Sequence, residues 1–148
     1  MHQSRRRAAS VLLIGVFAVT GVAGCSSGSP PPARPVPPAR MVRTGAAGVL
    51  SVVLTPLGAQ RVGVQTAAAT AAGPGRTVVP YSALLYQPDG RSVVYTVTGP
   101  LTYTLATVGV ASMQGSRVYL TGLTPGTVVV TVGGEELLGV QDGVGVET

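Results

Sequence analysis

Hydrophobic residues follow two different patterns along this chain of 148 residues. Near the N-terminus they form one nearly continuous run, Val11–Ala23, whose 13 residues are too few for a comfortable membrane span and suit the apolar segment of a signal peptide. From Gly48 onward they occur in short runs that alternate with polar residues and end at Gly, Pro or Asp. Alternation with a period of two is typical of β-strands that bury one face. The pattern therefore predicts a leader followed by a β-rich region.

Within the β-rich region we expect six or seven short strands. The runs that predict them are Val49–Leu54, Val62–Thr66, Val78–Tyr86, Ser92–Thr98, Leu101–Val110, Arg117–Thr121 and Thr127–Val132. Two short helical segments are also expected: Thr55–Arg61, where Thr55 is the N-cap and Pro56 the first helical residue, and one turn over Glu135–Leu138. Strands separated by turns every 8–12 residues or so indicate a mostly β fold, a small antiparallel β-barrel or sandwich.

Two irregularities interrupt this pattern. Ala67–Gly75 is rich in Ala, Thr and Gly and predicts a loop, although the chain on both sides of it should form one β-structure, because either side alone buries too little apolar area. In Leu101–Val110 the apolar residues first occupy every second position, then shift by one near Ala106, after which Val108 and Val110 carry the apolar face. A shift of one residue moves the side chains to the opposite face of a strand and predicts a bulge, a strong bend or a strand break.

The start of the chain resembles the leader of bacterial lipoproteins. Arg5–Arg7 form a basic segment, Val11–Ala23 is apolar, and Val22-Ala23-Gly24-Cys25 is similar to the lipobox of that class. The resemblance implies that the thiol of Cys25 receives a diacylglycerol and that the chain is cut before it, so that membrane lipid is a partner and the protein is held on the extracytoplasmic face of the cell membrane. The alternative is that Cys25 is a free or buried structural thiol. As the single cysteine of the chain, it has no partner for an intramolecular disulfide.

The segment after Cys25 is rich in proline. Ser26–Arg43 contains six prolines, which fix φ and lack a backbone donor, so we expect an extended tether that joins no sheet. At about 3.1 Å per residue, such a tether would hold a domain a few tens of ångströms from its anchor. The expected organisation is a signal peptide over residues 1–24, a lipidated cysteine with a disordered tether over 25–47, and one β-domain over 48–148.

Charge and chemistry exclude several classes of function. The formal charge of +5 falls to +2 from Cys25 onward, where seven arginines face five acidic residues, and no clustered basic face of the kind that binds nucleic acid is evident. The only histidine, His2, belongs to the leader, so no nucleophile–base pair and no zinc site is expected. Glu135 and Glu136 are adjacent and cannot converge as an acid/base pair. We therefore expect no catalytic residue, no metal and no cofactor, and no enzyme.

Two separated parts of the chain resemble the membrane-proximal domain of periplasmic adaptor subunits (membrane fusion proteins) of RND-type efflux pumps. The first part is Val53–Thr66. The second consists of Val79–Leu85, Pro88–Gly90, Val93–Val97, Val108–Val110, Gly115–Val118, Gly122–Gly126 and Val128–Leu138. In full adaptors a lipoyl-like motif and a coiled-coil hairpin lie between the two parts, whereas here only Ala67–Thr77 does. The chain thus looks like that domain without the insertion.

This resemblance implies a module that docks on an inner-membrane transporter of the efflux type through protein–protein contacts. The hairpin's reach toward an outer-membrane channel is not implied, because the hairpin is absent. The expected docking residues lie in two loops: Gly122, Leu123, Thr124, Pro125 and Gly126 in the first, and Gly133, Gly134, Glu135 and Glu136 in the second. The alternative is a stand-alone cell-envelope lipoprotein whose β-domain binds a small ligand or an envelope component.

Overall fold

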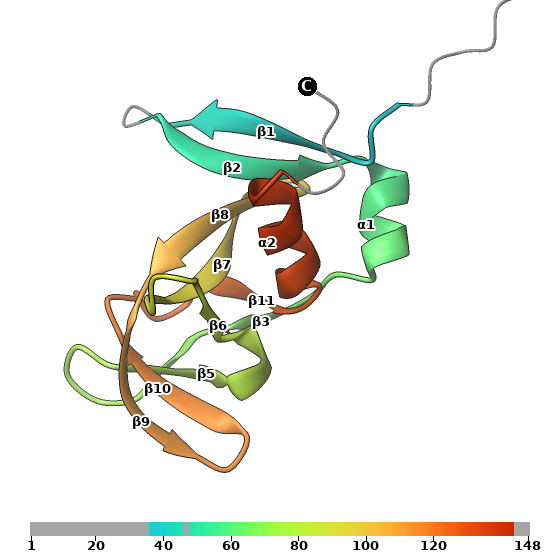
Figure 1. Ribbon diagram of the computed structural model, residues 1–148. Helices are drawn as coiled ribbons and strands as arrows, with labels where there is room; N and C mark the ends of the chain where they lie inside the picture. The colour runs from blue at the N-terminus through green and yellow to red at the C-terminus, as the bar shows by residue number, and fades with distance from the viewer. Residues whose placement is uncertain (1–35, 46–47, 144–148) are drawn as a thin grey trace, which may run out of the picture. The chain divides into compact units, whose positions relative to one another are not determined.

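The computed structural model describes residues 36–45 and 48–143, and its strands form two antiparallel sheets (Figure 1). The strands are β1 (Ala39–Thr44), β2 (Val49–Leu54), β3 (Gln65–Ala68), β4 (Thr70–Ala71), β5 (Thr77–Pro80), β6 (Leu85–Tyr86), β7 (Ser92–Gly99), β8 (Thr102–Thr107), β9 (Gly109–Gln114), β10 (Arg117–Thr121) and β11 (Val128–Val132). The helices are α1 (Pro56–Val62), the 3-10 turn η1 (Tyr81–Ala83) and α2 (Gly134–Gln141). The mostly β, antiparallel fold is confirmed, and because neither sheet closes on itself within the described residues, it is sandwich-like.

The two sheets are joined at corners where one strand ends and the next begins in the other sheet. The larger sheet has the order β1-β2-β8-β7-β11-β3, with β6 paired to β7, and the smaller has the order β4-β5-β10-β9. The chain changes sheet at Ala69, between β3 and β4, and at Val108, between β8 and β9. Both corners are buried and hydrogen-bonded: the N–H of Ala69 donates to the carbonyl of Thr127 at 2.8 Å, and that of Val108 to Ser92 at 2.9 Å. The chain on both sides of residues 73–75 therefore forms one β-structure, as predicted.

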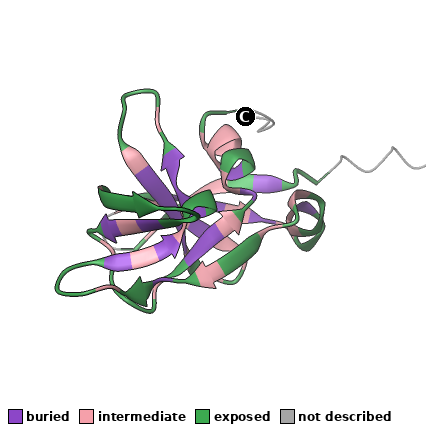
Figure 2. Cartoon of the chain, turned by 90° about the horizontal axis from the view of Figure 1, so that it is seen from below, coloured by how far each residue is buried: buried purple, intermediate pink, exposed green. Residues whose placement is uncertain are grey.

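Buried side chains form two cores, one on each face of the larger sheet. The first core, between this sheet and α2, contains Ala39, Val52, Leu54, Leu85, Val93, Tyr95, Tyr103, Val130 and Leu137. The second core, between the two sheets, contains Ala69, Val79, Ala83, Leu84, Val94, Val108, Val118, Leu120 and Val129. Figure 2 shows the buried segments in the middle of the strands, with exposed residues in the hairpins. Strand β7 is buried on both faces because a second layer covers each of them.

The alternation shift near Ala106 marks the point where the chain leaves one core and enters the other. Before the shift, Tyr103 is buried in the first core and Leu105 packs against it. After the shift, Ala106 packs against the second core and Val108 is buried in it. The strand break that was one of the predicted outcomes occurs at Val108, where β8 ends and β9 begins in the other sheet. The shift in the alternation thus marks the point where the apolar side chains of this segment stop packing in the first core and begin to pack in the second.

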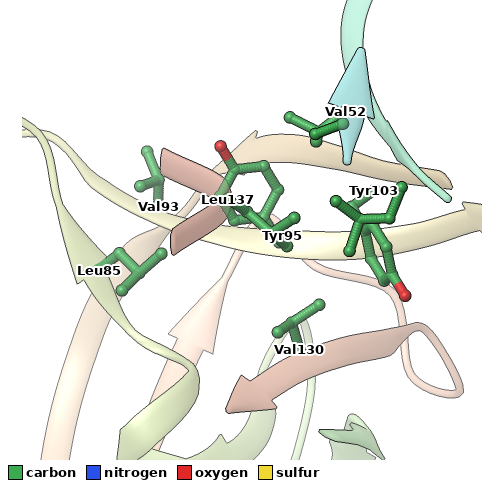
Figure 3. Close-up of a cluster of buried hydrophobic side chains, with 9 residues drawn as sticks. Val52, Leu85, Val93, Tyr95, Tyr103, Val130 and Leu137 are labelled. Carbon is green, nitrogen blue, oxygen red and sulfur yellow. The ribbon is translucent and has the colours of Figure 1, made fainter. Parts of the chain in front are cut away.

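Helix α2 covers the first core and is longer than predicted. It extends over eight residues, two turns instead of one, and buries Leu137 completely. Figure 3 shows Leu137 gathered with Tyr95 and Val93 of β7 and with Leu85 of β6. The hydroxyl of Tyr95 donates to Oε1 of Gln141 at 2.9 Å, which satisfies its polar end beneath the last turn of the helix. The second turn of α2 is therefore stabilised by contacts with core residues that lie far away in sequence.

The prediction that no strand forms before Gly48 is wrong, because β1 occupies part of the expected tether. The last proline of the segment, Pro38, lies directly before β1, and its carbonyl accepts from the backbone N–H of Thr55 at 2.9 Å and from the Thr55 hydroxyl at 3.3 Å. Gly58 makes this approach possible, since a Cβ there would lie 2.2 Å from the same carbonyl oxygen. The sheet thus begins one residue after the prolines end. The leader, Cys25 and the tether up to residue 35 lie outside the described residues.

Three further boundaries differ from the prediction. The strand expected over Val78–Tyr86 is interrupted by η1, which separates β5 from β6. The N-cap at Thr55 and Pro56 at the start of α1 are confirmed, but the helix extends through Val62, which was predicted to begin a strand. Gly63 ends the helix in the left-handed conformation, with its N–H bonded to Ala59, and β3 begins only at Gln65. The loop predicted for 67–75 is wrong up to residue 71, because β3 and β4 take part of it despite the low strand propensity of alanine.

Candidate functional site

A hollow of about 450 Å³ lies beside the start of α2, and we call it the α2 hollow. One wall comes from residues 81–86, which contain η1 and β6, and the other from the end of β11 and the first turn of α2. Its lining residues are Tyr81, Ser82, Leu84, Leu85, Tyr86, Thr131, Gly133, Gly134, Glu135 and Glu136. The structure thus brings one of the two predicted docking loops together with a segment about 50 residues earlier in the chain, a distance that local pattern does not bridge.

Two exposed tyrosines stand on the first wall. Tyr81 begins η1, where its N–H donates to the carbonyl of Ser116 at 2.8 Å and its own carbonyl accepts from Leu84 at 3.0 Å. Leu84 enters the second core and Leu85 the first, so the leucine pair ties this segment to both layers. The tyrosines at either end remain outside, with 46% of Tyr81 and 51% of Tyr86 exposed. Loss of hydration and the neighbouring Tyr81 raise the pKa of Tyr86, so the phenol of Tyr86 is neutral at pH 7.

Two carboxylates stand on the opposite wall. Glu135 and Glu136 occupy the first turn of α2, where negative charge is favourable because backbone N–H groups there are unpaired. Both side chains are exposed. The described residues contain one ion pair, between Asp89 and Arg91, so neither glutamate has a cationic partner there. The lining of the α2 hollow therefore combines two tyrosines with two glutamates that have no ion-pair partner among the described residues, and it also includes Leu84 and Leu85.

The glycines of this predicted loop position the helix and are not a free backbone surface. Gly133 is buried at φ +88°, and a Cβ on it would lie 2.6 Å from Cγ1 of Val62. A Cβ on Gly134 would lie 3.1 Å from Cδ1 of Leu85. These two residues let the turn from β11 into α2 pass close to α1 and β6. Of the four residues predicted for docking in this loop, only the two glutamates are exposed.

The other predicted docking loop, Gly122–Gly126, is the turn between β10 and β11 and does not line the α2 hollow. Its residues are exposed except Leu123, which packs against the second core. The N–H of Gly126 donates to the carbonyl of Ala69 at 2.8 Å, which ties the turn to the sheet corner. The two predicted loops are therefore separate features, and only one of them borders a concave surface.

Charged side chains are few and dispersed in the part of the chain that the structure describes. In residues 36–45 and 48–143, no three His, Cys, Asp or Glu side chains come together as metal ligands could. Asp89 bonds to Arg91 within the same turn. The backbone N–H of Arg91 donates to Oδ1 of Asp89 at 3.0 Å, and the Arg91 guanidinium donates to Oδ2 at 2.6 Å. These two hydrogen bonds lower the pKa of Asp89. Asp89 thus stabilises the turn in which it lies. The α2 hollow can stack on planar or cationic groups and attract positive charge.

Comparison of the chain with protein-family models, with curated proteins and with solved structures found no match. The resemblance to efflux adaptors therefore stays a prediction. No helix within the part of the chain that the structure describes has the length and apolar character needed to cross a membrane.

The hydrophobic pattern did not mark the tyrosines of the α2 hollow as exposed, because tyrosine most often packs in cores and between strands. Two other tyrosines, Tyr95 and Tyr103, are indeed buried. A signal for the exposed pair does exist, because Tyr81 directly follows Pro80 and Tyr86 directly follows the pair Leu84-Leu85. Adjacent leucines in an extended segment point to opposite sides, and here both sides are cores, which leaves the flanking residues at the surface.

Proposed function

We propose that this protein is a lipid-anchored docking module that binds a membrane protein through the α2 hollow and turns over no substrate. Cys25 anchors it to the extracytoplasmic face of the cell membrane, and the partner is an inner-membrane transporter of the efflux type. The observation that carries the proposal is that the exposed Tyr81 and Tyr86 line the same hollow as the exposed Glu135 and Glu136, together with the largely buried Leu84 and Leu85. Tyrosine is enriched in the centre of protein interfaces, where its apolar ring is buried and its hydroxyl finds a partner.

The size of the hollow explains why an anchor would matter. Tyr81 and Tyr86 are each about half exposed, so a partner that covered them would remove roughly 200 Å² from water, or about 5 kcal/mol at 25 cal/mol per Å². Loss of translational and rotational freedom on association opposes this by about 4–15 kcal/mol. Binding from free solution would therefore be weak. A tether to the same membrane raises the effective concentration of the two partners to about the millimolar range, far above that of free proteins, which favours even a weak association.

Site-specific crosslinking in cells tests the proposal. A photoreactive phenylalanine analogue replaces Tyr86, and a matched control carries it at Met113 on β9, which is 47% exposed against 51% for Tyr86. We expect position 86 to capture a polytopic membrane protein and position 113 to capture much less of it. Glu135→Gln together with Glu136→Gln should reduce the yield, and Cys25→Ala should abolish it. Equal capture from positions 86 and 113 would contradict docking through the hollow.

A second candidate is the envelope lipoprotein that binds a small ligand. The observation that favours it is the volume of the hollow, which at about 450 Å³ falls within the range of roughly 300–1,000 Å³ found for small-molecule sites. The same experiment separates the two candidates. Recovery from position 86 of envelope polymer fragments or soluble compounds, with no membrane protein, would favour this second function.

A further inference from the structure

The acidic residues of the chain are confined to its second half, whereas arginines occur in both halves. All five acidic residues lie at Asp89 or beyond it. Between residue 36 and Asp89 the structure describes four arginines, Arg40, Arg43, Arg61 and Arg76, and the sequence there contains no carboxylate. Such an asymmetry is typical of proteins with one face toward a polyanionic surface. It assigns the positive charge to the part of the domain that contains β1 and α1.

Exposed apolar residues accompany two of these arginines. Leu57 is 55% exposed on α1, and Arg61 lies four residues later, on the same face of the helix. A hollow of about 470 Å³ beside the start of α1 is lined by Val36, Pro37, Ala39, Arg40, Val53, Leu54, Thr55 and Pro56. We name the lipid face as the exposed set Val36, Pro37, Arg40, Pro56, Leu57 and Arg61. Basic residues beside exposed Leu, Val and Pro are the composition of surfaces that lie at a membrane interface.

The lipid face is also where the chain outside the structure ends. Val36 is the first described residue of the domain and lines the hollow next to Arg40. Eleven residues separate it from Cys25, so that even fully extended chain spans at most about 40 Å. An anchor at Cys25 therefore holds this end of the domain within that distance of the bilayer. Val36 and Arg40 line the hollow beside the start of α1, and Leu57 and Arg61 are exposed on that helix.

We propose that the lipid face rests on anionic phospholipid, with Leu57 at the headgroup level and Arg40 and Arg61 against the phosphates. The inference rests on the proposed anchor at Cys25 and goes beyond it by naming the surface and the lipid class. An arginine near an anionic bilayer strengthens attachment by about fivefold, so these two together contribute about 25-fold. Arg43 is left out because its guanidinium donates to the carbonyl of Gly48 at 3.3 Å within its own hairpin.

The test uses the lipidated full chain reconstituted in vesicles. The anchor occupies the only native cysteine, so Leu57→Cys supplies a single free thiol for an environment-sensitive fluorophore. Met113→Cys is the matched control, since Met113 is 47% exposed and lies on β9, outside the lipid face. In vesicles of 30% phosphatidylglycerol in phosphatidylcholine, we expect a blue shift of emission at position 57 and none at position 113. The shift should shrink in pure phosphatidylcholine and after Arg40→Gln with Arg61→Gln.

Flotation of the vesicles separates failure of this inference from failure of the anchor. A chain that floats with the vesicles but gives the same emission at position 57 in both lipid mixtures would overturn the lipid face and leave the anchor intact. An equal blue shift at positions 57 and 113 would also overturn it, because burial would not be specific to this surface. A chain that does not float at all would overturn the anchor of the proposed function, and the lipid face with it.

Discussion

Thr77, in the middle of the second sheet, supplies the sharpest test of the packing. Its side chain is fully buried in β5, between β4 and β10, and its hydroxyl has no hydrogen-bond partner among the described residues. A buried hydroxyl without a partner loses its hydration and gains nothing in return. Valine has nearly the same shape and the same preference for strands, so Thr77→Val removes the polar atom without opening a cavity. We therefore expect this substitution to stabilise the domain.

The magnitude follows from the cost of the unpaired group. Leaving a buried hydroxyl unsatisfied costs about 1–3 kcal/mol, and the exchange for a methyl group recovers most of that. For a domain of roughly 100 residues, 1 kcal/mol corresponds to about 4 °C in the melting temperature. Thr77→Val should accordingly raise the free energy of unfolding by about 1–2 kcal/mol and the melting temperature by about 4–8 °C, measured by urea denaturation and by calorimetry.

A second threonine provides the control with the opposite sign. Thr96 on β7 is also buried, but its hydroxyl donates to the carbonyl of Thr104 at 3.0 Å. Thr96→Val removes that bond and should lower the free energy of unfolding by about 1 kcal/mol. The reasoning is refuted if both substitutions destabilise the domain to the same degree, since the hydroxyl of Thr77 would then have a partner, such as a buried water.

Three further predictions concern close packing and pH. Gly133→Ala should lower the free energy of unfolding by about 2–4 kcal/mol, because it adds left-handed backbone strain and an overlap with a side chain of α1. Gly126→Ala is the control: Gly126 has a similar φ but nothing within 4 Å of the added Cβ, so this substitution should cost only about 1–2 kcal/mol. Equal losses in urea titrations would argue against the overlap at Gly133. Gly58→Ala should collide with the carbonyl of Pro38 and raise amide hydrogen exchange in β1 well above that in β7, and unchanged exchange in β1 would contradict this contact. Burial and, to a smaller degree, the charge of Asp142 raise the pKa of Tyr95 above its usual 10.0. The contribution of the neutral Tyr95 to the free energy of unfolding should therefore be fully present below about pH 10 and be lost as the pH rises beyond it. This loss should be smaller in Tyr95→Phe when unfolding is followed by circular dichroism.

The local pattern was sufficient for elements whose residues carry their own signals. Val49–Leu54 and Arg117–Thr121 are strands with the predicted bounds, because branched and aromatic residues in short runs bounded by turn residues favour extended chain in most contexts. The start of α1 was also predictable, since the hydroxyl of Thr55 accepts from the N–H of Gly58 within one helical turn. The same holds for the turn that contains Asp89. In each case the stabilising contacts lie within a few residues in sequence.

Other elements depend on neighbours that lie far away in sequence. Strand β1 exists because β2 pairs with it and Pro38 is held by Thr55, so the proline-rich composition before it gave no sign of a strand. The second turn of α2 depends on Leu137 and on Gln141, which meet β7 about 45 residues earlier in the chain. The α2 hollow likewise joins Tyr86 to Glu135 across the fold.

What the sequence by itself determined is the fold class, the break near Ala106 and the adjacency that prevents Glu135 and Glu136 from acting as an acid/base pair. Only the tertiary structure decided which residues face which core. The alternation of apolar and polar residues shows that a strand has two faces, but it does not show which elements cover each face. The tertiary structure also decided that Gly133 is buried while Tyr81 and Tyr86 are exposed, the reverse of what glycine and tyrosine in a short loop suggest. The physical reason is that exposure depends on the layers packed around a residue, and those layers come from the whole chain.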